Sequence, residues 1–192
     1  MSLPPPARDR KPQGRLFAVV GPSGVGKDTL MEGARARRPD LHLVRRVITR
    51  PETAGGERFE GVTPEAFAAR KAAGDFALDW SAHGLRYGIP RAELAPLAAG
   101  RDVLFNGSRA ALAPARERFP ALRVILLTAP PEVLAERLAA RGREGRAEIE
   151  ARLRRASFEL PPGIEAREVV NDAEPEQGIA RLLAAIGAEP QS

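Results

Sequence analysis

The sequence contains no cysteine, which excludes disulfides and also zinc or iron–sulfur sites built on thiolates. Its two histidines, His42 and His83, are too few and too far apart to indicate a histidine metal site. The apolar runs are shorter than the roughly 18 residues that a membrane span needs. The N-terminal stretch lacks the apolar core of a secretory signal, so residues 1–14 are expected to form a disordered tail. We therefore expect a cytoplasmic protein without a membrane partner.

Lysine and aromatic residues are also scarce. Only three of the 30 basic residues are lysines, aromatic residues make up 5 %, and no dense run of like charges occurs, although the net charge is +5. Proteins that bind nucleic acid commonly combine a basic patch with aromatic side chains that stack on bases. The scattered arginines therefore favour anionic small molecules as partners over nucleic acid, for which only the net charge argues.

Apolar, strand-like segments alternate with helical segments along the chain, and two stretches, 50–63 and 83–90, are rich in turn-forming residues. Such alternation predicts the α/β class, a three-layer α/β/α sandwich with a central parallel sheet, in a single domain of residues 15–187 followed by a tail at 188–192. The expected strands are 15–20, 41–48, 76–82, 102–107, 122–129 and 167–171, and the expected helices are 28–38, 64–74, 91–100, 108–119, 130–142, 147–160 and 174–187.

The stretch GPSGVGKD, residues 21–28, directly follows the first apolar strand and precedes a helix. Glycines at this spacing let backbone N–H groups curl around an anion, and the lysine then reaches the terminal phosphates. The N-terminus of the helix adds the positive end of its dipole. The pattern predicts an ATP-binding loop with the cofactor-binding residues Gly21, Pro22, Ser23, Gly24, Val25, Gly26, Lys27, Asp28 and Thr29.

Asp28 stands where most such loops have a Ser or Thr hydroxyl that holds magnesium. A carboxylate is a more strongly charged oxygen ligand, so Asp28 is predicted to bind Mg²⁺ directly or through water, and Thr29 could supply a hydroxyl one residue later. Aspartate is also favoured at helix starts, so a purely helix-capping role stays open.

Other segments resemble the guanylate-kinase-like branch of the P-loop kinases. ITR (48–50), together with Gly56-Glu57, resembles the acceptor-phosphate region of that fold, and GDFALDWSAHGLRYG (74–88) resembles its acceptor lid. RLAARGREGRAEIEARL (137–153) resembles the arginine-bearing lid over ATP, and VVND (169–172) the strand end beside the adenine. The resemblance implies a P-loop NTPase fold with an acceptor-binding region at about 49–90 and a lid at about 137–147.

The departures from that branch concern the acceptor. Guanylate kinases recognise guanine through a glutamate where this sequence has Leu78, and through a threonine and a serine where it has Ile89 and Pro90. These three side chains offer no hydrogen bonds, so a phosphate compound without guanine is expected. The GKD loop, ITRP, HGLRYG, NGSR (106–109) and RGRE (141–144) together resemble the ribose 1,5-bisphosphate phosphokinases of phosphonate utilisation. This resemblance implies conversion of ribose 1,5-bisphosphate to 5-phosphoribosyl 1-diphosphate with ATP and Mg²⁺.

The resemblance also implies roles for individual residues. Phosphoryl transfer needs positive charge around the moving group, and the guanidinium fork matches phosphate oxygens. No general base is required, because a phosphate monoester oxygen is already anionic near neutral pH. The expected catalytic residues are Lys27, Arg50, Arg137 and Arg141, and Arg137 and Asn171 are also expected to contact ATP. The acceptor is expected to contact Arg50, Glu57, Arg86, Tyr87, Asn106, Arg109 and Arg143.

Two other functions stay open on the sequence. A guanylate or other nucleoside monophosphate kinase would share the phosphate loop, although Leu78 argues against guanine. A non-catalytic guanylate-kinase-like binding module would need no intact loop, whereas this chain keeps both glycines and Lys27. No pattern indicates the oligomeric state.

Overall fold

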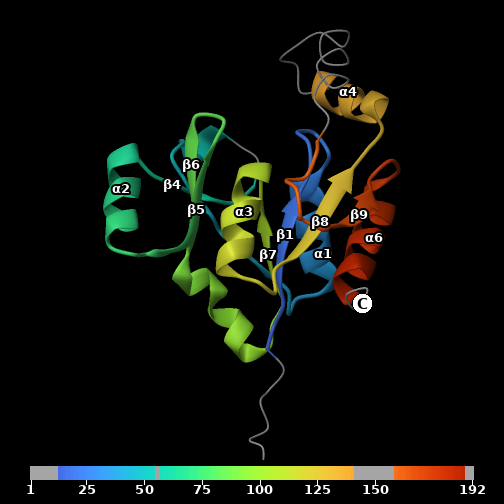
Figure 1. The fold of residues 1–192 in the computed structure, drawn as a ribbon. Coiled ribbons are helices and arrows are strands. Elements are labelled where there is room, and N and C mark those ends of the chain that lie inside the picture. Colours follow the sequence, from blue (N-terminus) through green and yellow to red (C-terminus); the bar gives the residue numbers. More distant parts are fainter. Residues whose placement is uncertain (1–12, 55–56, 141–157, 189–192) are drawn as a thin grey trace, which may run out of the picture.

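Strand β1 (Leu16–Val20) lies at the centre of a five-stranded parallel sheet in the computed structural model, which describes residues 13–54, 57–140 and 158–188. Its neighbours are β7 (Val103–Asn106) on one side and β8 (Arg123–Thr128) on the other. β2 (His42–Leu43) extends the sheet beyond β7, and β9 (Arg167–Val170) extends it beyond β8 (Figure 1). The parallel sheet predicted from the sequence is confirmed.

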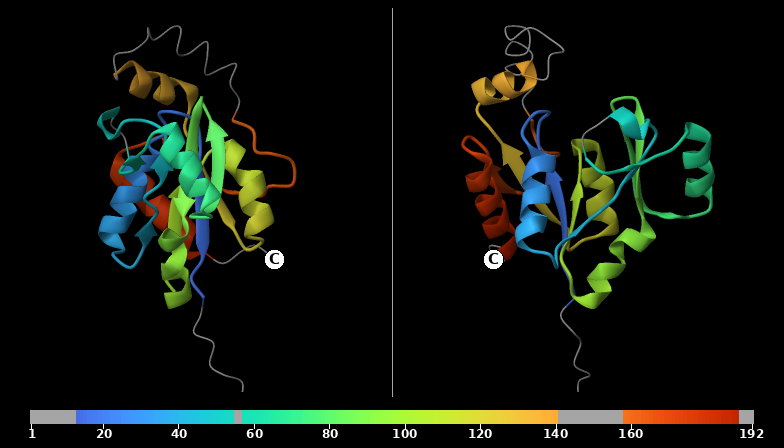
Figure 2. Two further views of the ribbon diagram at one scale, coloured as in Figure 1. Left: turned by 90° about the vertical axis from the view of Figure 1, so that its left-hand side faces the viewer. Right: turned by 180° about the vertical axis from the view of Figure 1, so that it is seen from behind.

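Helices cover both faces of this sheet. Because side chains alternate along a strand, Phe17 and Val19 of β1 face α1 (Lys27–Arg37) and α6 (Pro175–Gly187), whereas Ala18 and Val20 face α3 (Arg109–Arg118). Figure 2 shows these helices on opposite sides of the strands. Each face forms a buried apolar cluster, which gives the three-layer α/β/α sandwich expected from the sequence.

A second, four-stranded sheet stands beside the first. Its order is β4 (Glu60–Gly61), β3 (Val47–Ile48), β6 (Leu85–Pro90) and β5 (Phe76–Ala82), with β6 antiparallel to both of its neighbours. Helix α2 (Pro64–Ala72) covers its outer face, where Phe67 stacks on Phe76 at 4.7 Å between ring centroids. The inner face turns towards the main sheet and contributes Trp80 and Ile89 to the same apolar cluster as α3.

The segment 41–48 does not form the single strand that its apolar pattern predicts. Leu43 pairs with Leu104 of the main sheet, whereas Ile48 pairs with Tyr87 of the second sheet, so the chain passes from one sheet to the other between them. Hydrophobicity alone does not indicate that the chain changes sheets here, because both short strands lie in one continuous, largely apolar run of the sequence. The prediction of one strand was wrong in this respect.

Residues 85–90, predicted as part of a turn, form strand β6, and only His83 and Gly84 make the hairpin loop. Both of these residues have positive φ angles, 52° and 74°, as a tight two-residue hairpin requires. The expected helix at 91–100 is the 3₁₀ helix η2 (Arg91–Ala99), in which Pro96 lacks the N–H that an α-helix would use. A short 3₁₀ turn, η1 (Glu52–Ala54), lies in the turn-rich segment that precedes β4.

Helix α4 (Pro131–Ala139) follows β8 and lies above the carboxyl ends of the main strands (Figure 1). The last residues of the predicted helix 130–142, and most of the predicted helix 147–160, lie outside the described residues. The described helices contain no stretch with the length and hydrophobicity that a membrane span requires.

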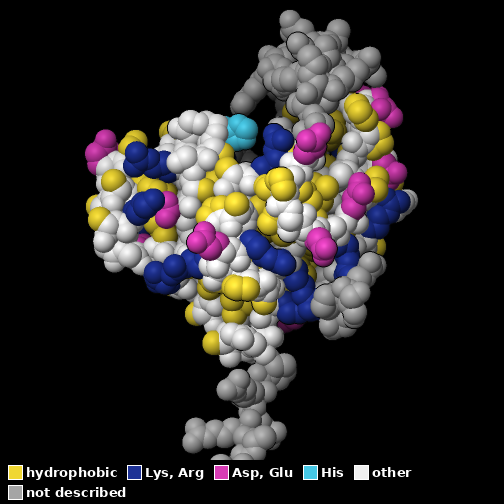
Figure 3. Space-filling view, in the orientation of Figure 1, with side chains coloured by type: hydrophobic (Ala, Val, Ile, Leu, Met, Phe, Trp, Pro, Cys, Tyr) yellow, Lys and Arg dark blue, Asp and Glu magenta, His cyan; other side chains and the backbone are white. Residues whose placement is uncertain are grey.

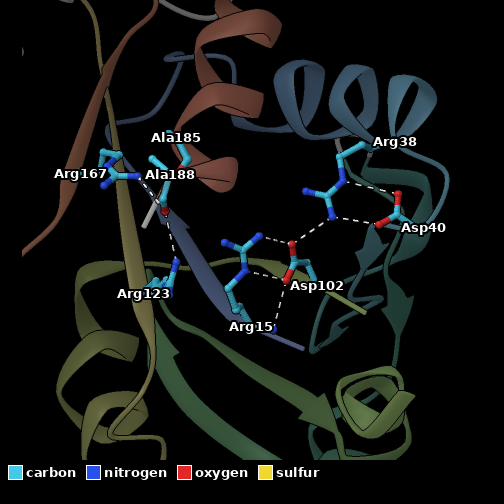
Figure 4. A network of polar contacts seen from close by, with 8 residues as sticks. All are labelled: Arg15, Arg38, Asp40, Asp102, Arg123, Arg167, Ala185 and Ala188. Carbon is cyan, nitrogen blue, oxygen red and sulfur yellow. Dashed lines mark hydrogen bonds and ion pairs between the residues drawn. The ribbon is translucent and has the colours of Figure 1, made fainter. Parts of the chain in front are cut away.

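A charged network closes the opposite end of the main sheet, at the amino ends of its strands. Asp102, just before β7, accepts hydrogen bonds from Arg15 Nε (2.9 Å) and Arg38 Nη2 (3.0 Å) (Figure 4). Arg38 also donates to Asp40 Oδ2 over 2.9 Å. Burial opposes ionisation of Asp102, but the hydrogen bonds from Arg15 and Arg38 outweigh it and lower its pKa to about 2. The network joins the start of β1, the end of α1 and the start of β7.

Candidate active site

The loop Gly21–Gly26 connects β1 to α1 at the carboxyl edge of the main sheet. Gly24 and Gly26 have φ angles of 84° and 93°, in the left-handed region that favours glycine. Gly26 is the N-cap of α1 and has no side chain with which to cap the first turn of this helix. The backbone amides of the loop and of the helix start are therefore arranged as an anion-binding site of the kind that holds phosphates.

The loop is fixed in place from below. Val25 is fully buried in the core, and its carbonyl oxygen accepts a hydrogen bond from Nδ2 of Asn171 over 2.8 Å. Asn171 follows β9 and is itself 4 % exposed, and its backbone N–H donates to Thr128 at the end of β8 (2.7 Å). The predicted ATP-binding residue Asn171 thus lies under the phosphate loop, where its side chain positions the loop.

Lys27 and Asp28 begin α1 directly after the loop. Lys27 Nζ donates to the carbonyl oxygens of Gly21 (2.8 Å) and Pro22 (3.2 Å), so the ammonium group lies across the loop. Asp28 Oδ1 accepts from Nδ2 of Asn106, the last residue of β7, over 2.8 Å. Of the other predicted loop residues, Ser23 and Thr29 are exposed.

The inner face of the second sheet opposes this loop. Residues 46, 48 and 50 share one face of the β3 segment, and Tyr87 lies across from Ile48 on β6. Tyr87 in turn pairs with Trp80, and their rings stack with centroids 5.3 Å apart and planes 7° apart. The guanidinium of Arg50 lies 4.4 Å from the ring centroid of Phe59. Figure 3 shows a narrow hollow at the upper edge of the molecule between its two halves, with a basic side chain at its rim.

Arg46 is a buried residue of this face that the sequence analysis did not single out. Its side chain is 7 % exposed, and its Nε and Nη2 atoms donate to the carboxylate of Glu57. Its guanidinium carbon lies 5.0 Å from the ring centroid of Tyr87 and 5.7 Å from that of Trp80. Burial lowers the pKa of Arg46 to about 10, which leaves the side chain charged near neutral pH.

Arg86 lies apart from the other predicted acceptor residues. It is exposed, and the alternation along β6 turns its side chain away from the face that carries Tyr87. There it interacts electrostatically with Glu65 in the first turn of α2. Its backbone N–H, by contrast, donates to Oγ1 of Thr49 next to Arg50 (2.9 Å).

Two of the remaining predicted arginines, Arg137 and Arg109, lie on α4 and α3. Arg137, on α4, donates from Nη1 to the carbonyl oxygen of Asn171 over 3.0 Å, which places it beside the phosphate loop. Arg109 is the exposed first residue of α3, and its guanidinium lies 5.0 Å from the ring centroid of Phe158. The predictions for Arg141 and Arg143 lie outside the described residues.

Comparison with solved structures gives the same fold. The guanylate kinase of Anaplasma phagocytophilum superposes with a TM-score of 0.64 over 92 % of this chain and 86 % of that chain, at 16 % sequence identity. At this identity the similarity establishes the fold alone. The AAA domain family matches residues 18–156, which include the phosphate loop.

Sequence relatives are much closer. A ribose 1,5-bisphosphate phosphokinase PhnN of Ruegeria sp. (strain TM1040) is 51 % identical over 186 residues, 96 % of this chain and 97 % of that protein. A bifunctional ribose 1,5-bisphosphokinase-thymidine phosphorylase of Cupriavidus necator (strain H16) is 46 % identical over 92 % of this chain. The chain spans only 26 to 30 % of the length of such bifunctional relatives. On these similarities, the chain belongs to the ribose 1,5-bisphosphate phosphokinase family.

Proposed function

We propose that the protein transfers the γ-phosphoryl group of ATP to ribose 1,5-bisphosphate and forms ADP and 5-phosphoribosyl 1-diphosphate, as a step of phosphonate utilisation. The observation that carries this proposal is the apolar character of the inner face of the second sheet at the positions that recognise guanine in guanylate kinases. Leu78 and Ile89, the positions where guanylate kinases recognise guanine, are 5 % and 1 % exposed, pair with each other and belong to the apolar core. Tyr87 packs against the same cluster, and Arg50, which lies over the ring of Phe59, is proposed to join it as a group that suits a phosphate.

The atom balance of this reaction selects the acceptor oxygen. The product carries its diphosphate on carbon 1, so an oxygen of the 1-phosphate, rather than the 5-phosphate, attacks the γ-phosphorus. The bond between that phosphorus and the β–γ bridging oxygen breaks, and ADP keeps the bridging oxygen. The attacking oxygen is anionic near neutral pH, since the second pKa of a phosphate monoester is about 6. The residues of the site therefore act by positioning and by charge rather than as a general base.

The residues at the loop suit the nucleotide side of this transfer. The amides of the loop, with Ser23 at its tip, would hold the β- and γ-phosphates, and Lys27 lies across the loop where its charge meets them. Arg137 enters from α4 beside Asn171 and would neutralise charge on the transferring group. Arg141 and Arg143 are proposed to assist from the lid.

The acceptor side is proposed to hold the reacting phosphate between the second sheet and α3. Arg50 and Tyr87 lie on the inner face of the sheet, and Arg109 begins α3 two residues beyond the strand that ends with Asn106. Arg86 is exposed, and its side chain starts on the outer face of the sheet. We propose that it contacts the acceptor from the edge of the hairpin. The proposed partner is a small molecule, and we propose neither a nucleic-acid nor a membrane partner.

The donor set near Asp28 fits a magnesium ion. Mg²⁺ in kinases binds one or two carboxylates, substrate phosphates and waters, all through oxygen. Asp28 supplies a carboxylate held by the amide of Asn106, and Thr29 supplies a neighbouring hydroxyl. Asp28 is therefore proposed as the metal ligand, directly or through water. The ion would supply positive charge that neutralises the phosphate oxygens of ATP.

ADP release with ATP and magnesium tests the proposal, with ribose 1,5-bisphosphate, GMP and AMP offered separately as acceptors. We expect turnover with the sugar bisphosphate and none above background with the nucleotides. Lys27→Met should lower the rate roughly 100-fold or more, because it removes a fixed charge from the transition state. Preferential turnover of GMP or AMP would overturn the proposed acceptor, and ATP binding without any turnover would favour a binding module.

A further inference from the structure

Arg46 is a charged side chain held in an otherwise apolar part of the second sheet. Strand register places it across from Ile89, because the preceding pairs on these antiparallel strands are Ile48 with Tyr87 and Val47 with Gly88. Ile89 pairs in turn with Leu78. The positions where guanylate kinases recognise the base are therefore apolar in this chain, and a guanidinium lies beside them.

A second arginine follows Arg46 on the same segment. Arg50 is four residues further along the chain, near enough for its charge to act against the ionised form of Arg46. Asp28 of the phosphate loop acts on Arg46 with the opposite sign. Two cations that repel each other at the edge of an ATP loop favour an anion bound between or beside them.

Glu57 neutralises Arg46 in the absence of a substrate. Its carboxylate accepts from Nε and Nη2, which form one side of the guanidinium fork. A phosphate group uses the same kind of two-point contact. The pair is buried, with side chains 7 % and 15 % exposed, so that removing one partner alone would leave an uncompensated charge. Glu57, predicted to contact the acceptor, therefore acts through Arg46.

We propose that Arg46 binds the 5-phosphate of the acceptor, the phosphate that does not react, and thereby selects a sugar bisphosphate over a sugar monophosphate. This inference rests on the proposed function, in which the 1-phosphate reacts. The Trp80–Tyr87 stack holds the guanidinium in place, and Glu57 occupies one side of the fork until the acceptor binds. Arg46 is a specificity-determining residue in this account, while Arg50 and Tyr87 hold the reacting end.

Removing one phosphate from the acceptor and one guanidinium from the protein, separately and together, tests the proposal. The specificity constant kcat/KM is measured for wild type and variant, with ribose 1,5-bisphosphate and with ribose 1-phosphate as acceptors. The variant is Arg46→Met combined with Glu57→Gln, which removes both charges of the buried pair at once. We expect kcat/KM for the bisphosphate to fall roughly 10- to 100-fold, the effect of a lost charged hydrogen bond. The value for the monophosphate and the KM for ATP should stay within about twofold of wild type.

The adjacent pair of Arg45 and Glu52 provides a matched control. It lies on the same segment, but its side chains are 57 % and 56 % exposed. Arg45→Met combined with Glu52→Gln should leave the discrimination between the two acceptors unchanged, because an exposed pair contributes little. Arg46→Lys, measured in parallel, keeps the charge but loses the fork and should give an intermediate loss for the bisphosphate alone.

The single tryptophan supplies a readout that does not depend on turnover. Trp80 contacts both Arg46 and Tyr87, so its fluorescence should change saturably when ribose 1,5-bisphosphate or ribose 5-phosphate is added. For ribose 5-phosphate this change should be lost in the variant with Arg46→Met and Glu57→Gln, and it should be kept in the Arg45 control. If wild type turns over neither acceptor, the proposed function fails, and the fluorescence titration still decides whether Arg46 binds the phosphate. If the variants lose both acceptors equally, or neither, Arg46 has no selective role and the inference is overturned.

Discussion

Asn106, at the end of β7, donates a hydrogen bond from Nδ2 to Oδ1 of Asp28 over 2.8 Å. The contact joins the strand end next to β1 to the first turn of α1, although the two residues are 78 positions apart. Many P-loop enzymes carry an acidic side chain near the metal at such a strand end, whereas this chain has an amide there and a carboxylate on the helix. A carboxylate oxygen that accepts from an amide keeps lone pairs for a cation. In this chain the negative charge of the proposed magnesium site therefore lies on the helix rather than on the strand end.

Replacing Asp28 tests this arrangement. Asp28→Asn should lower kcat roughly 10- to 100-fold and raise the magnesium concentration needed for half-maximal rate, because the site loses its charged oxygen ligand. Asp28→Ser, which restores the hydroxyl common in these loops, should retain more activity than Asp28→Asn. Initial rates across a magnesium titration measure both effects. An unchanged magnesium dependence in Asp28→Asn would assign Asp28 to helix capping alone.

Gly26 is expected to tolerate no side chain. A Cβ there would lie 2.7 Å from Nδ2 of Asn171, at a φ of 93°. Gly26→Ala should raise the Kd for ATP roughly tenfold or more, because it breaks the hydrogen bond that fixes the loop. Gly74→Ala is the matched control, since its φ is also positive, 72°, but the added Cβ meets nothing within 4 Å. Equal effects of both substitutions on ATP binding, measured by calorimetry, would contradict the role of the contact with Asn171.

Asn171 should stabilise the loop more than it contacts the nucleotide. Asn171→Ala leaves the buried carbonyl oxygen of Val25 without its amide donor and should lower the free energy of unfolding by about 1–3 kcal/mol. Asp172→Ala, next to it, removes only an exposed ion pair with Arg181 and should leave the unfolding midpoint nearly unchanged. Urea denaturation of ligand-free protein measures both. A stability of Asn171→Ala equal to wild type, together with weaker ATP binding, would indicate direct contact with ATP instead.

The sequence specifies the nucleotide side of the site better than the acceptor side, for a physical reason. The phosphate loop is a local structure, in which the spacing of Gly21, Gly26 and Lys27 determines the backbone and the charge together. Asn171 was also predicted near ATP, but its contact with Val25 spans 146 residues, and no local pattern indicates a hydrogen bond of that kind. Its contact with ATP stays a prediction, and its role beneath the loop was not predicted.

On the acceptor side, the important contacts depend on strand pairing. Arg46 was one arginine among many, and only the pairing of β3 with β6 places it under Tyr87 and beside Ile89. One signal was available, since Arg46 directly precedes Val47 and Ile48 in an extended run where a buried charged residue needs a partner. Arg86 and Tyr87, which were grouped together, point to opposite faces because they are neighbours on a strand rather than in a turn.

Asp102 should make the stability of the protein depend on acidity. Its pKa in the folded protein is about 2, below its ordinary value of 3.8, since hydrogen bonds from Arg15 and Arg38 outweigh the opposing effect of burial. The ionised form is therefore favoured in the folded state. The resulting stabilisation of about 1–2 kcal/mol is complete above pH 4 and is lost as the pH falls towards 2.

Asp102→Asn removes that dependence. The difference in unfolding free energy between wild type and Asp102→Asn should be largest near neutral pH and should shrink between about pH 4 and 2. Glu32→Gln, which removes an exposed pair with Arg35, should follow the wild-type profile. Urea titrations at a series of pH values measure the three proteins. A constant difference between wild type and Asp102→Asn across this range would contradict the assigned pKa.

The position of the new bond tests the central claim most directly. Phosphorus-31 NMR of a reaction with ATP, magnesium and ribose 1,5-bisphosphate distinguishes a diphosphate on carbon 1 from any other product. We predict that the signal of the 1-phosphate is replaced by the two coupled signals of a diphosphate, while the 5-phosphate stays a monoester and ADP appears in equal amount. An unchanged sugar spectrum, with conversion of GMP to GDP under the same conditions, would show instead that the inner face around Leu78 and Ile89 accepts a nucleotide.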